Sequence, residues 1–184
     1  MAIEKMLVEH CSATLASIKS ANLFSMYFTT EEELKRQIDY WNICMAEKGI
    51  RLSELGVQRG RVLVYVYRRN QLQADLQCPG VAAFLKKYGY ESVDIEYALE
   101  RLRDRIVKSG SFPHEIGLFL NYPLMDVKGF IENKGQNYQY SGLWKVYCNE
   151  EETKELFRKY EKCKDVYIRL WEQGRSVMQL TVAA

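Results

Sequence analysis

The sequence predicts an α+β fold, with a mixed, partly parallel sheet of about four to five strands covered by helices. Three observations support this fold class. Residues 61–67 are β-branched or aromatic on both faces, which is typical of a strand in the interior of a sheet. Residues 31–48 and 150–172 carry apolar side chains at helical spacing. A strand–helix–strand order occurs near each end of the chain, and right-handed crossovers of this kind join parallel strands.

The first half of the chain contains clear start and stop signals. Thr30 followed by Glu33 has the spacing of a capping box, and Gly49 has the position of a residue that ends a helix. The turn at 58–60 joins two apolar runs of strand length. The predicted elements here are a helix over 2–16, a strand over 22–28, the helix over 31–48, and strands over 50–57 and 61–67.

The second half is mainly helical, with a second strand–helix–strand unit at its end. Pro79 and Pro123 suit the first turns of helices, and Asn149 with Glu152 has capping-box spacing. The predicted elements are helices over 71–77 (capped by Asn70 with Gln73), 79–89, 92–108, 111–121, 123–132 and 150–172, with strands over 142–148 and 176–182. No linker or repeat interrupts the pattern, so we predict a single domain over 1–184.

Charge and cysteine content restrict the class of protein. With 26 basic and 24 acidic residues the net charge is +2, and the basic side chains form no stripe of the kind that binds nucleic acid. No apolar run approaches the roughly 18 residues of a membrane span. The five cysteines are odd in number, lack CxxC spacing and follow no secretory signal. We therefore expect a cytoplasmic protein with free thiols and with no nucleic-acid or membrane partner.

The sequence contains no motif that identifies a reaction, a cofactor or a metal. Only two histidines occur, and His10 with Cys11 would diverge on a helix rather than face one ion. Paired CxxC, HExxH, GxSxG, GxGxxG and GxxxxGK[ST] patterns are missing from the sequence. We predict no metal site, and the cofactor stays unknown.

Segment 112–147 is the region where a functional surface is expected. It combines two short helices that begin near proline with an aromatic, lysine-bearing loop, and helix N-termini suit anions. His114 and Glu115 are the candidate catalytic residues, as an acid–base pair; alternatively they only start a helix. The candidate ligand-binding residues are Lys19, Lys128, Lys134, Lys145 and Trp144.

Several blocks of this sequence resemble a bacterial family catalogued as domain of unknown function 3793. The central blocks are Phe112–Leu120, Tyr122-Pro123, Asp126–Ile131 and Gly142–Tyr147, and the N-terminal ones are Leu7–Cys11 and Lys19–Phe24. The resemblance covers essentially the whole chain. It implies no assigned reaction or catalytic residue, and it favours a role in redox or iron physiology.

Two functions from different classes follow. The first is a non-catalytic binding or accessory module that recognises a small anionic ligand or a cytosolic protein through segment 112–145. The second is an enzyme in which His114 and Glu115 act as an acid–base pair, with Lys19 or Lys145 stabilising negative charge.

Overall fold

The computed structural model describes residues 2–58, 60–109 and 112–183 and confirms the α+β class. Its main sheet is antiparallel, with the strand order β1-β3-β2. The strands are β1 (Ala21–Tyr27), β2 (Ile50–Gln58) and β3 (Arg61–Arg68). The prediction that 61–67 form an interior strand is therefore confirmed, because β3 lies between the other two.

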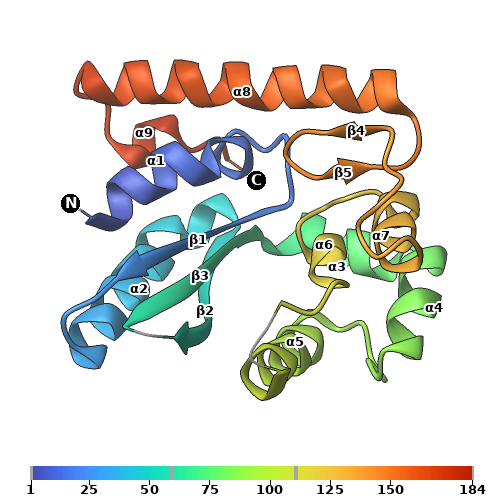
Figure 1. Cartoon of the computed structure of the whole chain (residues 1–184). Coiled ribbons are helices and arrows are strands. Elements are labelled where there is room, and N and C mark those ends of the chain that lie inside the picture. Colours follow the sequence, from blue (N-terminus) through green and yellow to red (C-terminus); the bar gives the residue numbers. More distant parts are fainter. Residues whose placement is uncertain (1, 59, 110–111, 184) are drawn as a thin grey trace.

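Helices cover both faces of this sheet (Figure 1). In chain order they are α1 (Ala2–Leu15), α2 (Glu31–Met45), α3 (Arg69–Gln77), α4 (Pro79–Lys87), α5 (Ile95–Ser109), α6 (Ile116–Phe119), α7 (Leu124–Glu132), α8 (Glu150–Glu172) and α9 (Val177–Leu180). A short 3₁₀ turn, η1 (Ala46–Lys48), extends α2 to Gly49, whose φ of 69° ends it.

The two faces of the sheet bury different apolar clusters. One cluster joins α1, α2 and α9 to side chains such as Phe24 and Val64. The other joins α3 to α7 to side chains such as Tyr65. Helix α8 lies outside α1 rather than directly on the sheet, as Figure 1 shows at the top of the molecule. Residues 150–172 were expected to cover the sheet. They pack on α1, which itself lies on the sheet, so they cover it only indirectly.

The predicted parallel pairing is wrong. Strands β1 and β2 do run in the same direction, and α2 connects them as expected. However, β2 turns back at once into β3, and β3 pairs with β1 on its other side. Strand β3 thus lies between β1 and β2, which would have to be neighbours to form a parallel pair. Both pairings in the sheet are therefore antiparallel.

The two strands predicted at the end of the chain do not join the main sheet, which has three strands in the described residues and not the predicted four to five. Residues 142–148 contribute only to a small hairpin of β4 (Tyr140–Ser141) and β5 (Lys145–Val146). Residues 177–180 form a helical turn, because Ser176 and Gln179 make a reciprocal capping box. The alternation of apolar residues in this tail fits a strand, but the capping hydrogen bonds favour the helix.

Helix starts were predicted with mixed success. Thr30 caps α2 by accepting a hydrogen bond from the Glu33 amide at 3.2 Å, as expected. Asn149 instead adopts a left-handed conformation and makes no side-chain cap. Gln73 likewise does not pair with Asn70 in a cap, but accepts from the Ile95 amide at the start of α5. Residues Arg59 and Ser111, within the predicted turn and helix start, lie outside the described residues.

Candidate functional site

Segment 112–147 folds against the second apolar cluster and carries a cleft. All four residues of α6 are buried, so this short helix anchors the segment in the core. Asn121 then adopts a left-handed conformation with φ of 60°, which turns the chain toward α7. Pro123 precedes α7 directly, as a helix-starting proline should. The chain next passes through the β4–β5 hairpin and returns to α8.

Asp126 fixes the hairpin to α7. Its side chain is 2% exposed, and one carboxylate oxygen accepts a hydrogen bond from Trp144 Nε1 at 2.8 Å. The other oxygen accepts from the Tyr147 amide at 2.8 Å and the Cys148 amide at 3.1 Å. Burial, followed by the neighbouring Asp126 carboxylate, raises the pKa of the Cys148 thiol. Hydrogen bonds accepted by a carboxylate are strong, so the three bonds that Asp126 accepts from Trp144, Tyr147 and Cys148 hold the hairpin in place.

Gly129 allows the helix and the hairpin to approach closely. A Cβ atom at this position would lie 2.6 Å from Tyr147 Cβ and 2.8 Å from its Cδ1. Real side chains do not pack at such distances, so a larger residue would push the hairpin away from α7.

An aromatic stack forms one wall of the cleft. The Tyr122 ring stacks on Trp144 with centroids 4.4 Å apart, and Trp144 meets Phe157 of α8 edge-on at 4.5 Å. Burial raises the pKa of Tyr122, which keeps its phenol neutral. Packed rings of this kind provide a rigid apolar surface.

The cleft has a volume of about 340 Å³. Three stretches of chain supply its walls: the turn before α6, the inner side of α7, and the hairpin. His114 lies exposed at its edge with its ring 5.1 Å from that of Phe130. The full lining is Phe112, Pro113, His114, Ile116, Gly117, Tyr122, Asp126, Val127, Phe130, Ser141, Gly142, Leu143, Trp144 and Lys145.

Lys145 lines this cleft, but its ammonium already has partners. Nζ donates a hydrogen bond to the Gly135 carbonyl at 2.6 Å and lies 4.8 Å from the centre of the Tyr138 ring. The amine therefore helps to fold the loop between α7 and β4. It can contribute positive charge to the cleft without leaving these partners.

The structure brings together three of the predicted site residues. His114, Trp144 and Lys145 line one cleft. Lys19 contacts Tyr122, which belongs to the cleft wall, with Nζ 5.3 Å from the ring centre. The other two predicted lysines lie elsewhere.

Lys128 and Lys134 do not line the cleft. Lys128 Nζ points toward α4 and lies 5.9 Å from the Phe84 ring centre. Lys134 is exposed in the turn after α7, where its φ is 51°. Helical geometry explains the position of Lys128, because a residue two places from Asp126 and Phe130 on α7 projects away from the face that those two share. Lys134 lies beyond the end of α7, where the left-handed turn redirects the chain.

The proposed acid–base pair is not assembled. His114 is exposed, whereas the Glu115 side chain is 1% exposed and forms an ion pair with Arg105. Glu115 also accepts a hydrogen bond from the Tyr90 hydroxyl at 3.2 Å. Burial, followed by this carboxylate, raises the pKa of Tyr90. Adjacent residues in a turn point in different directions, so Glu115 lies in the core while His114 lies at the edge of the cleft.

The sequence did not indicate Asp126 or Tyr122 as residues of the site. An aspartate in the first turn of a helix is ordinary, because it favours the positive end of the helix dipole. Its hydrogen-bond partners lie 18 to 22 residues further along the chain. No local spacing signals such a contact.

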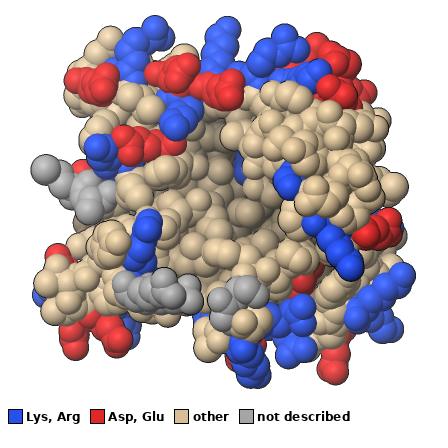
Figure 2. Space-filling model, in the orientation of Figure 1, with Lys and Arg blue, Asp and Glu red and all other residues tan. Residues whose placement is uncertain are grey.

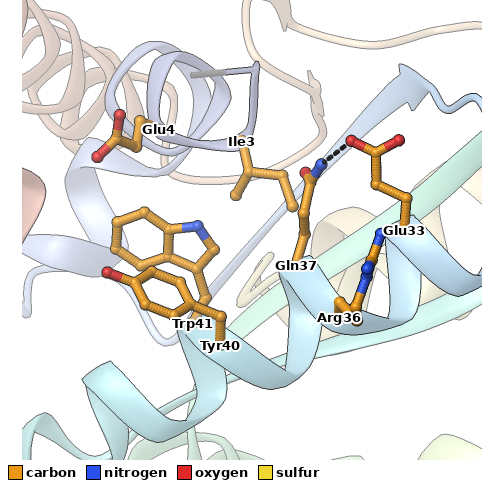
Figure 3. A pocket seen from close by; sticks show the side chains of 7 residues that line it. All are labelled: Ile3, Glu4, Glu33, Arg36, Gln37, Tyr40 and Trp41. Carbon is orange, nitrogen blue, oxygen red and sulfur yellow. Dashed lines mark hydrogen bonds between the residues drawn. The ribbon is translucent and has the colours of Figure 1, made fainter.

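A second concave surface lies between α1 and α2, with a volume of about 420 Å³ (Figure 3). Ile3 and Glu4 of α1 face a row of α2 side chains across it. Gln37 donates a hydrogen bond to Glu33 at 3.1 Å, one helical turn away. Trp41 is 7% exposed and forms part of the apolar core beneath the groove. The other lining residues are Arg36 and Tyr40.

The described residues bring together no group of three or more metal-ligating side chains. All five cysteines are free; Cys11 is fully buried, which raises the pKa of its thiol. Burial, followed by Lys164, lowers the pKa of His10. Among the described helices none is both long enough and apolar enough to cross a bilayer.

Charged side chains gather along the α8 edge of one face, whereas the middle of that face is hollowed and mostly uncharged (Figure 2).

No curated protein and no solved structure matches this chain. The resemblance found in the sequence is confirmed, because a family model described as "Protein of unknown function (DUF3793)" matches residues 7–181. The chain therefore belongs to the DUF3793 family.

Proposed function

We propose that this protein is a cytosolic binding module whose cleft takes a small molecule with a planar, apolar body and an anionic group. The observation that carries the proposal is the convergence of His114, Trp144 and Lys145 on one cleft from separate stretches of chain. A volume of about 340 Å³ lies near the lower end of small-molecule sites, which span roughly 300–1,000 Å³. This size favours a small ligand over a folded partner protein.

The chemistry of the walls supports this ligand class. The Tyr122–Trp144 stack and Phe130 provide flat apolar surfaces for the body of a ligand. His114 and Lys145 supply the basic character of the cleft. The carboxylate of Asp126 already accepts three hydrogen bonds from the hairpin, so it is less available to bind a cation.

Binding fits the cleft better than acid–base catalysis. Glu115 is committed to Arg105 and Tyr90 in the core and does not line the cleft. His114 therefore lacks Glu115 as a partner, and the carboxylate of Asp126, which also lines the cleft, is already bonded to the hairpin. A cytosolic location is proposed because the free thiols suit a reducing compartment.

Anilinonaphthalene sulfonate tests the proposal, because it joins an apolar planar body to an anion. We expect it to bind the native protein saturably at about one site per chain. His114→Ala and Leu143→Asp should each weaken binding roughly tenfold, the equivalent of one contact of about 1.4 kcal/mol. Thermal melting of each variant must remain cooperative, because dyes of this kind also bind partly unfolded chains.

Ile43→Asp is the matched control for Leu143→Asp. Both residues are exposed aliphatic side chains, at 76% and 51%, and only Leu143 lines the cleft. Equal loss of dye binding in the two variants would refute the cleft as the site. Native mass spectrometry of freshly purified protein would then show whether any small molecule accompanies the chain.

A further inference from the structure

Lys19 is a buried amine in the loop between α1 and β1. Its residue is 7% exposed, and its side chain lies between two tyrosine rings. Nζ is 5.3 Å from the centre of the Tyr122 ring and 5.8 Å from that of Tyr160 on α8. The loop is held in place because Ser20 donates a hydrogen bond to Asp75 of α3, and Gln71 donates one to Ser17 at 2.8 Å.

No carboxylate among the described residues forms an ion pair or a hydrogen bond with the Lys19 ammonium. The titratable groups that face it are the Cys11 thiol of α1 and the phenols of Tyr122 and Tyr160. Burial raises the pKa of each of these groups, so all three are neutral near pH 7. The carboxylate of Asp75 accepts hydrogen bonds from Ser20, the neighbour of Lys19, and from Asn121.

The ammonium nevertheless keeps contact with solvent. Among the described residues, Arg101 Nε is the one side-chain nitrogen or oxygen atom that is fully buried and has no hydrogen-bond partner. No hydrogen bond from Lys19 Nζ occurs among the described residues either, but this atom is not completely sealed from solvent.

A buried charge without a counter-charge is costly and is usually paired. Burial lowers the pKa of Lys19 to about 8, so the amine is still mostly protonated at pH 7. The tyrosine rings stabilise a cation through their faces, but they cannot neutralise it. A ligand that supplies the missing negative charge would remove most of this cost.

We infer that the Lys19 ammonium, held between Tyr122 and Tyr160, binds an oxyanion (a carboxylate or a phosphate) of a small molecule. This site goes beyond the proposed cleft, because Lys19 and Tyr160 do not line the cleft and Tyr122 is the side chain that the two sites share. Its failure would leave the cleft hypothesis intact, and the converse also holds.

Thermal melting in matched salts tests the inference. Wild type, Lys19→Met and the control Lys162→Met, which removes an exposed lysine of α8, are melted at pH 7 in chloride, acetate or phosphate at equal ionic strength. We expect phosphate or acetate to raise the melting temperature of wild type and Lys162→Met by about 2–4 °C relative to chloride. Lys19→Met should show no such gain, and the more effective anion identifies the ligand class. An equal response of all three proteins would overturn the inference.

Titration of the wild-type protein keeps the test independent of folding defects in Lys19→Met. The pKa of Lys19, followed by nuclear magnetic resonance of its side chain, should rise by about one unit when phosphate or acetate replaces chloride. An unchanged pKa in both anions would also overturn the inference.

Discussion

The aromatic cleft and the α1–α2 groove differ in rigidity more than in size. The groove is the larger, at about 420 Å³ against about 340 Å³. Its polar walls, however, include exposed side chains of α2 such as Glu33 and Arg36, and the hydrogen bond from Gln37 to Glu33 lies within α2 and does not link α2 to α1. The cleft is bounded by stacked rings, and a buried carboxylate holds its hairpin in place. Volume alone therefore does not indicate a binding site.

Rigidity matters because a binding site must avoid the cost of ordering its own side chains. Immobilising a flexible side chain costs roughly 0.5–1.5 kcal/mol. Ligand binding in the groove would add this free-energy cost for each side chain that becomes ordered, namely Arg36, Gln37 and Glu33. Tyr122 and Trp144 are already fixed by mutual stacking, so the cleft is preorganised.

The largest expected effect comes from removing the carboxylate that holds the cleft together. Asp126→Ala leaves Trp144 Nε1 and the amides of Tyr147 and Cys148 without their acceptor. A buried donor left unpaired costs about 1–3 kcal/mol, and the two amides are only partly buried, so we expect a loss of about 4 kcal/mol in the free energy of unfolding. Urea denaturation measures it.

Asp165→Ala on α8 is the control for this substitution, because Asp165 is exposed. It should change stability by less than about 0.5 kcal/mol. If Asp126→Ala proved as mild as Asp165→Ala, the cleft would be no more rigid than the groove, and the contrast between them would fail.

The next largest effect concerns the Lys19 ammonium, which lies against the Tyr122 ring of the cleft wall. Burial lowers the pKa of Lys19 from 10.5 to about 8, equivalent to about 3 kcal/mol. Below pH 8 the amine is protonated in both the folded and the unfolded chain, and the full cost of the buried charge is present. Between pH 8 and 10.5 the unfolded chain binds more protons at this group, so its contribution to stability rises with pH.

Lys19→Met isolates this contribution. The free energy of unfolding of wild type minus that of the variant should increase by up to about 3 kcal/mol between pH 7 and pH 10. Tyrosines and cysteines with raised pKa values oppose stability at high pH, but they are present in both proteins and cancel. A difference that stays constant with pH would show that Lys19 is not desolvated.

A smaller effect is expected where α7 meets the hairpin. Gly129→Ala places a Cβ 2.6 Å from Tyr147 Cβ, and overpacking of this kind costs about 1–3 kcal/mol. Gly56→Ala is the control, because its Cβ would lie 3.6 Å from the nearest atom, Ile106 Cγ2. Thermal melting compares the two. Equal melting temperatures would mean that the hairpin moves away from α7 at no cost, and so is not rigid.

The sequence was most informative where local chemistry and the fold agree. The strand over 61–67 is apolar on both faces and proved central, and Thr30 caps α2 as its spacing predicts. Residues of segment 112–147, where a functional surface is predicted, line a cleft. In each case the signal lies within a few residues.

The errors arise where distant residues decide the structure. Insertion of β3 between β1 and β2 depends on a pairing across the sheet, which the strand–helix–strand order does not specify. Glu115 pairs with Arg105 in the core, and this contact separates it from His114. The strand predicted over 176–182 is a different error, because the spacing of Ser176 and Gln179 is a capping box that sequence reasoning overlooked.

The smallest effect is expected in the groove, and it decides whether the comparison holds. Gln37→Ala removes the hydrogen bond to Glu33 on an exposed helix face, and pairs of this kind contribute about 0.2–0.5 kcal/mol. The variant should therefore unfold within about 0.5 kcal/mol of wild type and bind anilinonaphthalene sulfonate equally well. Arg36→Ala should behave in the same way. A loss above about 1.5 kcal/mol, or a tenfold loss of dye binding, would mean that the groove is as organised as the cleft. The choice of the cleft as the binding site would then have to be reversed.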